Sequence, residues 1–459
     1  MKKTRLSDIF NADSIRNKKR ILDRFEINKK EKRLFLDAIE EIENNEGGSC
    51  DKVVLEEKDC NFYDYDGTLL YSYTKEEALA LTELPPLPTQ PGLICQEWNW
   101  DLEDIKESLN EINVCDIGAI YTTDNGETRL YVKIYDDTKN IKMLLRSKNG
   151  TVTIDWGDGI IDVLDCTHNY NPNSPDSIRI NPLHNYTEIG NYCIKITTTI
   201  DDILILGGVT TTDISGIFSA QEEKKSYQHI LIKAFIGDNV DLYEPFQDAC
   251  FLECVTLPNH IGYRYHCLSM NNCSTIKHIN IPKNTSIFAN GFAFNNNLEI
   301  ICFSKSVTNG PQDDLYNNTN SYTSCYSLKH IYLKYLPYKS VTFRNNHSLN
   351  KIILNDLMTT INSYAFNECL KLKEIKVPKN VNSINMYAFD IPIGGVVDFS
   401  ACVNIPSLIN SGIEVQKKQI PYATIIVPDV LYDEWIAATN WANYAEIIIK
   451  QSEYAEIQK

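Results

Sequence analysis

The sequence predicts a mainly β protein with short N-terminal helices, a β-sandwich, and then a solenoid of stacked coils with a C-terminal cap. Three observations lead to this prediction. Tyr occurs 26 times in 459 residues and, together with Thr and Ile, favours β structure. Residues 117–200 consist of short alternating strands separated by turn residues. From about residue 225 onward, one apolar unit recurs every 21 to 30 residues.

Residues 1–48 are predicted to form a helical docking arm. Residues 15–27 and 29–45 have the apolar spacing of two short helices. Residues 1–33 carry twelve Lys and Arg against five Asp and Glu, whereas the whole chain has a net charge of −17. A basic arm on an acidic body indicates docking onto an acidic partner, with a solvated basic helix as the alternative. No nucleic-acid reader motif accompanies the arm, so we expect no direct contact with nucleic acid.

Composition excludes several classes of protein. No segment approaches the apolar length of a membrane span, so we expect no membrane insertion. The positive N-terminus lacks the apolar core of a signal peptide, which predicts synthesis in the cytoplasm. The fourteen Cys form no C-x-x-C pair and predict free, buried thiols in a reducing compartment. We therefore expect no metal and no cofactor.

Residues 49–116 are predicted to form a hairpin followed by a helical linker. Asp66-Gly67 lies between two aromatic, alternating runs, which is typical of a tight hairpin turn, and Tyr63 and Tyr65 could face Tyr71 and Tyr73. The same stretch spells D-x-D-G-T from Asp64, which resembles the nucleophile motif of haloacid-dehalogenase-like phosphatases. The preceding residues are half polar, unlike the apolar strand that such an enzyme needs. We therefore favour the hairpin and predict no catalytic residues.

Residues 117–200 form the predicted sandwich. The stretch 152–159 (VTIDWGDG) and the later H-x-Y-x-x-x-G-x-Y at 184–192 resemble the PKD-like module, an immunoglobulin-type fold. The resemblance implies a core position for Trp156, a turn at Asp158-Gly159 and a closing strand from Tyr192. Carboxylates in this region could hold calcium, although turn formation is the alternative; they are Asp155, Asp158 and Asp162.

Residues 201–420 are the predicted solenoid. The recurring pattern is L-x-x-I-x-L-P, in strands starting at residues 252, 276, 298, 328, 349 and 372. From the second unit on, a small residue stands three positions before each strand unit. These residues are Cys273, Asn295, Cys325, Asn346 and Cys369. This slot resembles the one that holds a buried Asn or Cys at the turn between coils of leucine-rich repeats, and the resemblance implies a buried ladder with a structural role for the three Cys.

Stretches such as 361–390 and 291–301 resemble the BspA-type leucine-rich repeat, and Phe294, Phe366 and Phe389 match its phenylalanine. Such repeats present one sheet face for binding, and the candidate contacts are Tyr332, Tyr335 and Tyr338, with core packing as the alternative. Residues 421–459 contain Trp435 and Trp441 and are predicted to cap the open end of the solenoid.

The order of these parts is similar to repeat proteins of gut bacteria and their phages, and the N-terminal stretch resembles virion proteins of crAss-like bacteriophages. The resemblance implies a virion structural protein of the head or tail fibre type, made in the host cytoplasm. Its partners would be other virion proteins, through the arm, and a host-surface glycan or protein; we also expect a homo-oligomer. The alternative is a bacterial BspA-like adhesin or effector, and a phosphatase is a remote third.

Overall fold

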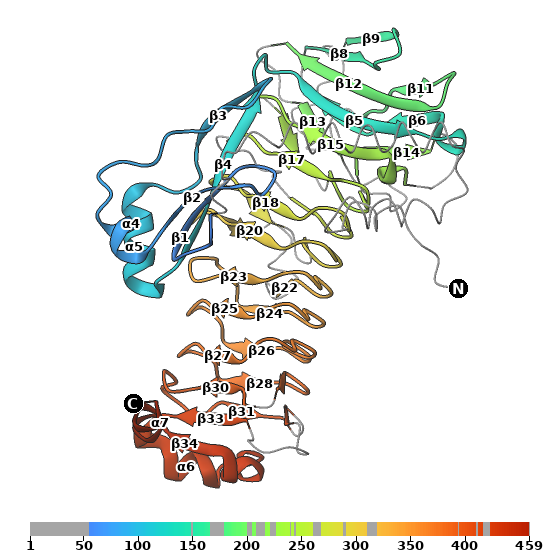
Figure 1. The fold of residues 1–459 in the computed structure, drawn as a ribbon. Helices are drawn as coiled ribbons and strands as arrows, with labels where there is room; N and C mark the ends of the chain where they lie inside the picture. Colours follow the sequence, from blue (N-terminus) through green and yellow to red (C-terminus); the bar gives the residue numbers. More distant parts are fainter. Residues whose placement is uncertain are drawn as a thin grey trace, which may run out of the picture. The chain divides into compact units, whose positions relative to one another are not determined.

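The computed structural model describes residues 55–458 apart from 148–149, 166–178, 200–203, 208–215, 221–225, 239, 243–244, 260–267, 288–290, 310–318, 393, 410–411 and 416–422. The chain divides into the units Met1–Leu55 and Glu56–Lys459. The helices expected at 15–27 and 29–45, within the predicted arm 1–48, lie outside the described residues. The second unit is mainly β, as predicted: mixed sheets with a few short helices precede a β-solenoid that ends in small helices (Figure 1). None of the helices in this part has the length and apolar composition that a bilayer crossing requires.

The first sheet belongs to what we call the N-terminal module, residues 56–124. Its strand order is β2-β1-β4-β3, in which β1 and β4 are parallel and the other pairs antiparallel. The elements are β1 (Cys60–Tyr63), β2 (Leu69–Tyr73), α4 (Lys75–Leu79), β3 (Leu93–Trp98), α5 (Leu102–Ile112) and β4 (Cys115–Thr123). The sequence boundary at 116/117 therefore falls inside β4, which the sheet assigns to this module. All nine residues of β4 are buried, as expected for a strand covered on both faces.

The hairpin β1–β2 confirms the prediction at Asp66-Gly67, but its cross-strand pairs differ. Tyr71 lies opposite Phe62, and Tyr73 lies opposite Cys60. The turn is longer than two residues, because the Asp64 amide donates to the Thr68 carbonyl (2.9 Å). Tyr65 therefore lies in the turn and not in the strand, and the register shifts at Phe62/Tyr63.

Three sheets follow the N-terminal module, of which the first two named here are mixed and the third is antiparallel. Their strand orders are β17-β15-β5-β12-β8-β9, β10-β7-β13-β16 and β11-β6-β14. The strands are β5 (Thr128–Ile134), β6 (Asn140–Met143), β7 (Leu145–Ser147), β8 (Thr151–Asp155), β9 (Ile161–Asp165), β10 (Arg179–Ile180), β11 (Leu183–Asn185), β12 (Gly190–Thr198), β13 (Leu204–Leu206), β14 (Phe218–Ala220), β15 (Leu231–Phe235), β16 (Val240–Leu242) and β17 (Cys254–Thr256). Alternating inward residues of β5, β6, β8 and β12 share one apolar core.

These sheets continue into the solenoid without a break. Strand β15 pairs antiparallel with β5 on one side and parallel with β17, the strand of the first sequence repeat, on the other. Strand β13 likewise pairs antiparallel with β7 and parallel with β16. One hydrophobic core extends from Leu130 in β5 to Ile448 near the C-terminus. The mixed sheets therefore close the N-terminal end of the solenoid, which would otherwise expose apolar edges.

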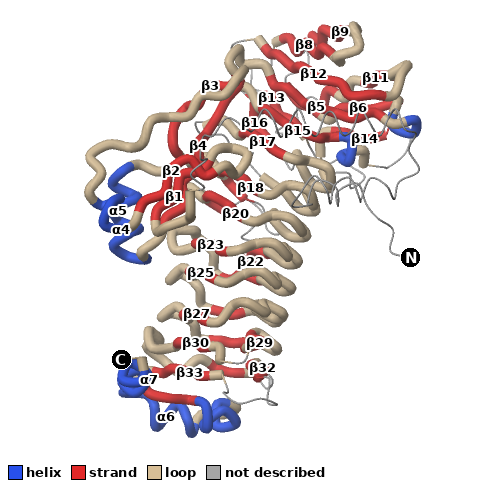
Figure 2. Tube along the Cα trace, viewed as in Figure 1, coloured by secondary structure: helices blue, strands red, loops and turns tan. Residues whose placement is uncertain are grey.

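The coils of the solenoid stack by parallel pairing of short strands, which Figure 2 shows in red between loops. One strand per coil follows the predicted pattern: β18 (His278–Asn280), β20 (Ile300–Cys302), β23 (His330–Tyr332), β25 (Lys351–Ile353) and β27 (Glu374–Lys376). Strand β30 (Val396–Asp398) continues this series one coil beyond the predicted units. The other short strands are β19 (Ser286–Ile287), β21 (Thr308–Asn309), β22 (Thr319–Ser321), β24 (Ser340–Thr342), β26 (Thr360–Ile361), β28 (Ser383–Ile384), β29 (Phe389–Ile391), β31 (Ser407–Leu408) and β32 (Ile413–Val415). In each strand from β18 to β30 that is named first above, the middle residue points into the core, as Ile331, Ile352 and Ile375 do.

The C-terminal residues cap the solenoid, as predicted for 421–459. The elements are β33 (Thr424–Val427), η3 (Asp429–Leu431), α6 (Tyr432–Ala437), η4 (Trp441–Ile447), β34 (Ile448–Lys450) and α7 (Gln451–Ile457). Strands β33 and β34 extend the sheet of β27 and β30 in parallel. The buried rings of Trp435 and Trp441 lie 5.6 and 5.3 Å from Phe399 of the last coil. The two indoles thus cover the apolar end of the core.

Candidate binding face of the repeat region

The phosphatase-like residues have structural roles. Asp64 is buried, and its carboxylate accepts hydrogen bonds from the Tyr121 hydroxyl (2.7 Å) and from Nε2 of Gln90 (2.6 Å). Asp66 accepts a hydrogen bond from the Thr68 amide inside the turn (2.9 Å). The second acidic stretch, residues 157–162, belongs to a different sheet, beside β8 and β9. The two motifs therefore do not form one site.

The three carboxylates considered for calcium each satisfy a local group. Asp155 accepts from the Gly157 amide, Asp162 accepts from the Trp156 indole (2.8 Å), and Asp158 lies 2.9 Å from Nε2 of His184. His184 in turn stacks on the buried Trp156, with ring centroids 4.5 Å apart. Within the described part of the chain, no group of three or more His, Cys, Asp or Glu is arranged to hold a metal ion.

The predicted ladder of small residues is confirmed as a structural feature of the coils. Cys273, Asn295, Cys325, Asn346 and Cys369 are all buried. Each thiol lies near a carbonyl of the preceding coil, as Sγ of Cys325 does at 3.0 Å from the Phe292 carbonyl. The Asn346 amide donates to the Tyr322 and Phe343 carbonyls (2.8 and 2.7 Å). These side chains satisfy backbone oxygens that would otherwise be buried without partners.

An aromatic column runs beside this ladder, and four of its rings stand three residues before the rungs Asn295, Cys325, Asn346 and Cys369. Its neighbouring rings lie 5.0 to 6.3 Å apart and are those of Phe292, Tyr322, Phe343, Phe366, Phe389 and Phe399. The prediction for Phe366 and Phe389 is confirmed, but the one for Phe294 is wrong. Phe294 is 49% exposed, whereas Phe292 is 2% exposed. Phe294 stands directly before the rung Asn295, at a left-handed turn position (φ 63°) that several coils repeat.

The ladder predicts how its thiols react. Burial raises the pKa of Cys325 and of Cys369 to about 12, so neither thiol is ionised near neutral pH. We expect iodoacetamide at pH 8 to leave both unmodified in the folded protein and to modify both in urea. Cys250, which is only half-buried, is the internal control and should react first. Peptide mapping by mass spectrometry measures this, and rapid native labelling of Cys325 would contradict the ladder.

The residues that flank each inward position point out of the solenoid, and together they form its strand face. In the first coils this face is covered by the N-terminal module. Side chains of the two parts interlock. The Asn99 amide donates to the Ile281 and Cys302 carbonyls (3.0 Å each), and the Asn280 amide donates to the Ala119 carbonyl (3.0 Å). Gly118 permits this approach, because a Cβ atom there would clash with Asn280.

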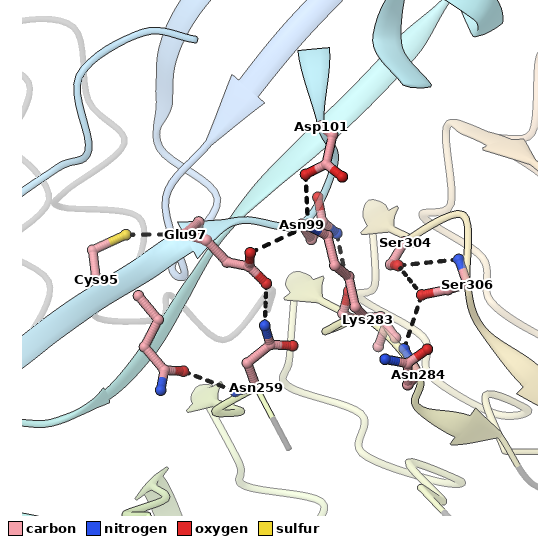
Figure 3. A network of polar contacts seen from close by, with 11 residues as sticks. Cys95, Glu97, Asn99, Asp101, Asn259, Lys283, Asn284, Ser304 and Ser306 are labelled. Atoms are coloured by element: carbon pink, nitrogen blue, oxygen red, sulfur yellow. Dashed lines mark hydrogen bonds and ion pairs between the residues drawn. The ribbon is translucent and has the colours of Figure 1, made fainter. Parts of the chain in front are cut away.

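Ion pairs surround these buried amides. Lys283 contacts Glu97 (3.2 Å) and Asp101 (2.8 Å), both in the N-terminal module, as Figure 3 shows. Lys305 likewise contacts Asp104 and Glu107 of α5. Sequence reasoning missed this interface. Its signal was the polar character of outward positions such as His278 and Asn280, which by itself does not identify what covers them.

The three tyrosines predicted as ligand contacts lie in two different environments. Tyr338 is buried in the core. The Tyr335 hydroxyl lies 3.0 Å from Glu111 of α5, and its ring packs against Trp100. Tyr332 and Tyr335 line a small cavity of about 20 Å³ with residues of the N-terminal module, enough for one water molecule. These two tyrosines therefore belong to the covered part of the strand face.

The strand face is open over three coils. Its side chains there are half-buried or exposed: Lys351, Ile353, Glu374, Lys376, Val396 and Asp398. We call this set the open face. Beyond it, Ile426 of β33 is buried where α7 contacts that strand. The open face thus lies between the N-terminal module and α7, and it combines two cations, two anions and two aliphatic side chains.

Comparison with known families identifies six copies of the BspA type leucine rich repeat region, over residues 242–334 and 269–392. Residues 242–392 are therefore a BspA-type repeat region, folded as the β-solenoid described above. The C-terminal domain of the DNA polymerase III alpha subunit is similar to residues 105–169. That stretch begins in α5 and ends beyond β9, so it combines parts of two sheets and carries no functional assignment. No curated protein matches the chain.

Proposed function

We propose that the protein is a non-enzymatic binding protein, namely a bacteriophage virion component of the head or tail fibre type. In this proposal its N-terminal arm, residues 1–48, attaches to other virion proteins, and its repeat region binds a glycan or protein on the host surface. The observation that carries the binding role is the regular strand face of the repeats, which stays open over Lys351–Asp398. The virion role is supported by the sequence resemblance of the arm and by the order of the parts.

The proposal includes a PKD-like identity for the sheets around Trp156. The buried indole, the Asp158-Gly159 turn with φ 94° at Gly159, and the packing of Tyr186 against Tyr192 (4.4 Å) support it. In the fibre proposal this part is a spacer. A bacterial BspA-like adhesin or effector is the second candidate, because the repeat region alone would serve it equally well.

Immunogold electron microscopy separates the two candidates. Antibody against Glu56–Lys459 should label purified phage particles under the fibre proposal and the bacterial surface under the adhesin proposal. Deleting residues 1–48 should leave a folded chain, because the unit Glu56–Lys459 has its own core. The truncated chain should no longer join particles, because it lacks the proposed docking arm. Normal incorporation of the truncated chain would overturn the docking role of the arm.

Charge reversal tests the open face. We expect the double variant Lys351→Glu/Lys376→Glu to weaken adsorption of the purified chain to host cells about tenfold, about 1.4 kcal/mol. The unfolding midpoint should not change, since both side chains are exposed. The matched control is Lys371→Glu/Lys379→Glu, which reverses two exposed charges near the same strand but outside the open face. Equal losses in both variants would place binding elsewhere.

A further inference from the structure

The N-terminal module is a separately cored body. Phe62, Trp98 and Ile117 belong to a hydrophobic cluster distinct from the core of the solenoid. Between the two cores lie a small apolar cluster of Tyr63, Ile300 and Cys302 and the ring contacts Trp100–Tyr335 and Tyr65–Phe235. The interlocked amides and the ion pairs supply the polar contacts of the interface. Because the two cores are separate clusters, one body can leave the other without loss of either core.

Two buried histidines of the solenoid lie under this module. Nε2 of His330 is 2.6 Å from Oδ2 of Asp116 in β4, and Asn61 of β1 donates to the other oxygen of that carboxylate (3.1 Å). Nε2 of His278 is 2.6 Å from Oδ1 of Asn280. Nδ1 of His278, however, is buried and has no hydrogen-bond partner among the described residues. If Nδ1 gained a proton, the new N–H group would therefore have no hydrogen-bond acceptor among the described residues.

Two residues of the module, Tyr63 and Gly67, lie directly against His278. The Tyr63 ring lies 5.2 Å from the imidazole, and a Cβ atom on Gly67 of the hairpin turn would come within 2.8 Å of the His278 Cβ. Cys302 of the neighbouring coil lies 3.9 Å from its Nε2. The charged groups that face the two histidines come mainly from the module: Asp64, Asp66 and Asp116 toward His278, and Asp116, Glu57 and the solenoid's Lys351 toward His330.

We propose that the N-terminal module is an acid-releasable cover of the strand face, held at neutral pH and released when His278 gains a proton. This inference rests on the proposed binding role of that face, because release would expose the outward residues of β18, β20 and β23 as additional binding surface. In the covered state only the open face can bind a partner, whereas in the released state the coils of β18, β20 and β23 can bind one as well.

The direction of the pH dependence follows from the two histidines. Burial lowers the pKa of His278 to about 4. The stability of the covered state that depends on neutral His278 is therefore complete above pH 6.5 and is lost as the pH falls from 6.5 toward 4. Burial also acts against the charged form of His330, but Asp116 outweighs it and raises the pKa of His330. The His330–Asp116 contribution is therefore present below pH 6.5 and is lost as the pH rises through the raised pKa. Acid release thus depends on His278. Between pH 6.5 and pH 4 the equilibrium constant for release of the module should rise by the order of 100-fold.

A native thiol reports the release. Cys302 points outward from β20 and is fully buried by the module, whereas Cys325 and Cys369 are buried in the ladder. We would label the full chain with 4,4′-dithiodipyridine, which reacts with thiols in acid, and quantify each Cys by mass spectrometry. Between pH 6.5 and pH 4, the Cys302 rate should rise by the order of 100-fold relative to Cys325 and Cys369.

Two variants assign the effect. His278→Gln keeps a polar group near Asn280 but cannot be protonated, so its Cys302 rate should stay low at pH 4. His347→Gln removes an exposed histidine paired with Glu368 and should keep the acid response. The proposal fails if wild-type Cys302 stays protected at pH 4, if His278→Gln responds like the wild type, or if all three thiols react together. No ligand enters these measurements, so a failure of host binding or of virion attachment would be recognised separately.

Discussion

Replacing Phe292 by Ala should destabilise the repeat region by about 3–5 kcal/mol, whereas Phe294→Ala should change its stability by less than about 0.5 kcal/mol. The two residues are two positions apart, but Phe292 is a buried member of the aromatic column and Phe294 is half exposed. Loss of the Phe292 ring leaves a cavity beside Tyr322 and Phe303, whose rings lie 5.8 and 6.0 Å away. The surrounding coils are fixed by parallel strand pairing and can close such a cavity only in part.

Urea unfolding followed by circular dichroism measures this difference. The pair of variants is its own control, because both remove the same phenyl group from the same coil. At Phe294 the left-handed backbone adds a second expectation: Phe294→Gly should be neutral or stabilising, since Gly adopts φ 63° without steric cost. Equal destabilisation by both Ala variants would mean that the column does not contain Phe292.

The repeat region could be predicted in detail because each coil repeats one local pattern. The strands at 276, 298, 328, 349 and 372 follow from apolar spacing, and the buried ladder from Cys273 to Cys369 follows from the resemblance to leucine-rich repeats. The misplacement of Phe294 has the same origin. Phe294 follows an Ala, as Phe366 and Phe389 do, but the spacing of three residues to the rung selects Phe292. Counting from Asn295 would have identified the buried ring from sequence.

The covered strand face could not be predicted, because it depends on contacts between residues far apart in the chain. Asn99 and Cys302, or Asp116 and His330, are separated by about two hundred residues. Outward residues such as His330 and Tyr332 look alike in sequence whether solvent or another part of the chain lies over them. The assignment of β4 fails for the same reason: its alternation fits the next sheet, but β1 and β3 pair with it.

Removing the Asp116 carboxylate should cost about 3–5 kcal/mol in the attachment of the N-terminal module to the solenoid. Asp116→Ala leaves the His330 imidazole buried without its counter-charge and removes the acceptor of the Asn61 amide. Thermal unfolding should then show the module separating before the repeat region. A matched exposed pair is present in the same chain: His347 and Glu368 lie 3.5 Å apart, with side chains 43% and 54% exposed. Glu368→Ala should cost at most about 1 kcal/mol.

The cost of Asp116→Ala would come from an unpaired charge and not from the attraction in the pair. Taking both charges out of water opposes most of their mutual attraction, so an apolar replacement of both should be close to neutral. We therefore expect Asp116→Leu/His330→Phe to recover most of the stability that Asp116→Ala loses. If the double variant is as unstable as the single one, the ion pair itself holds the module in place. If neither variant changes the unfolding of the module, the contact between β4 and β23 does not hold the two bodies together in solution.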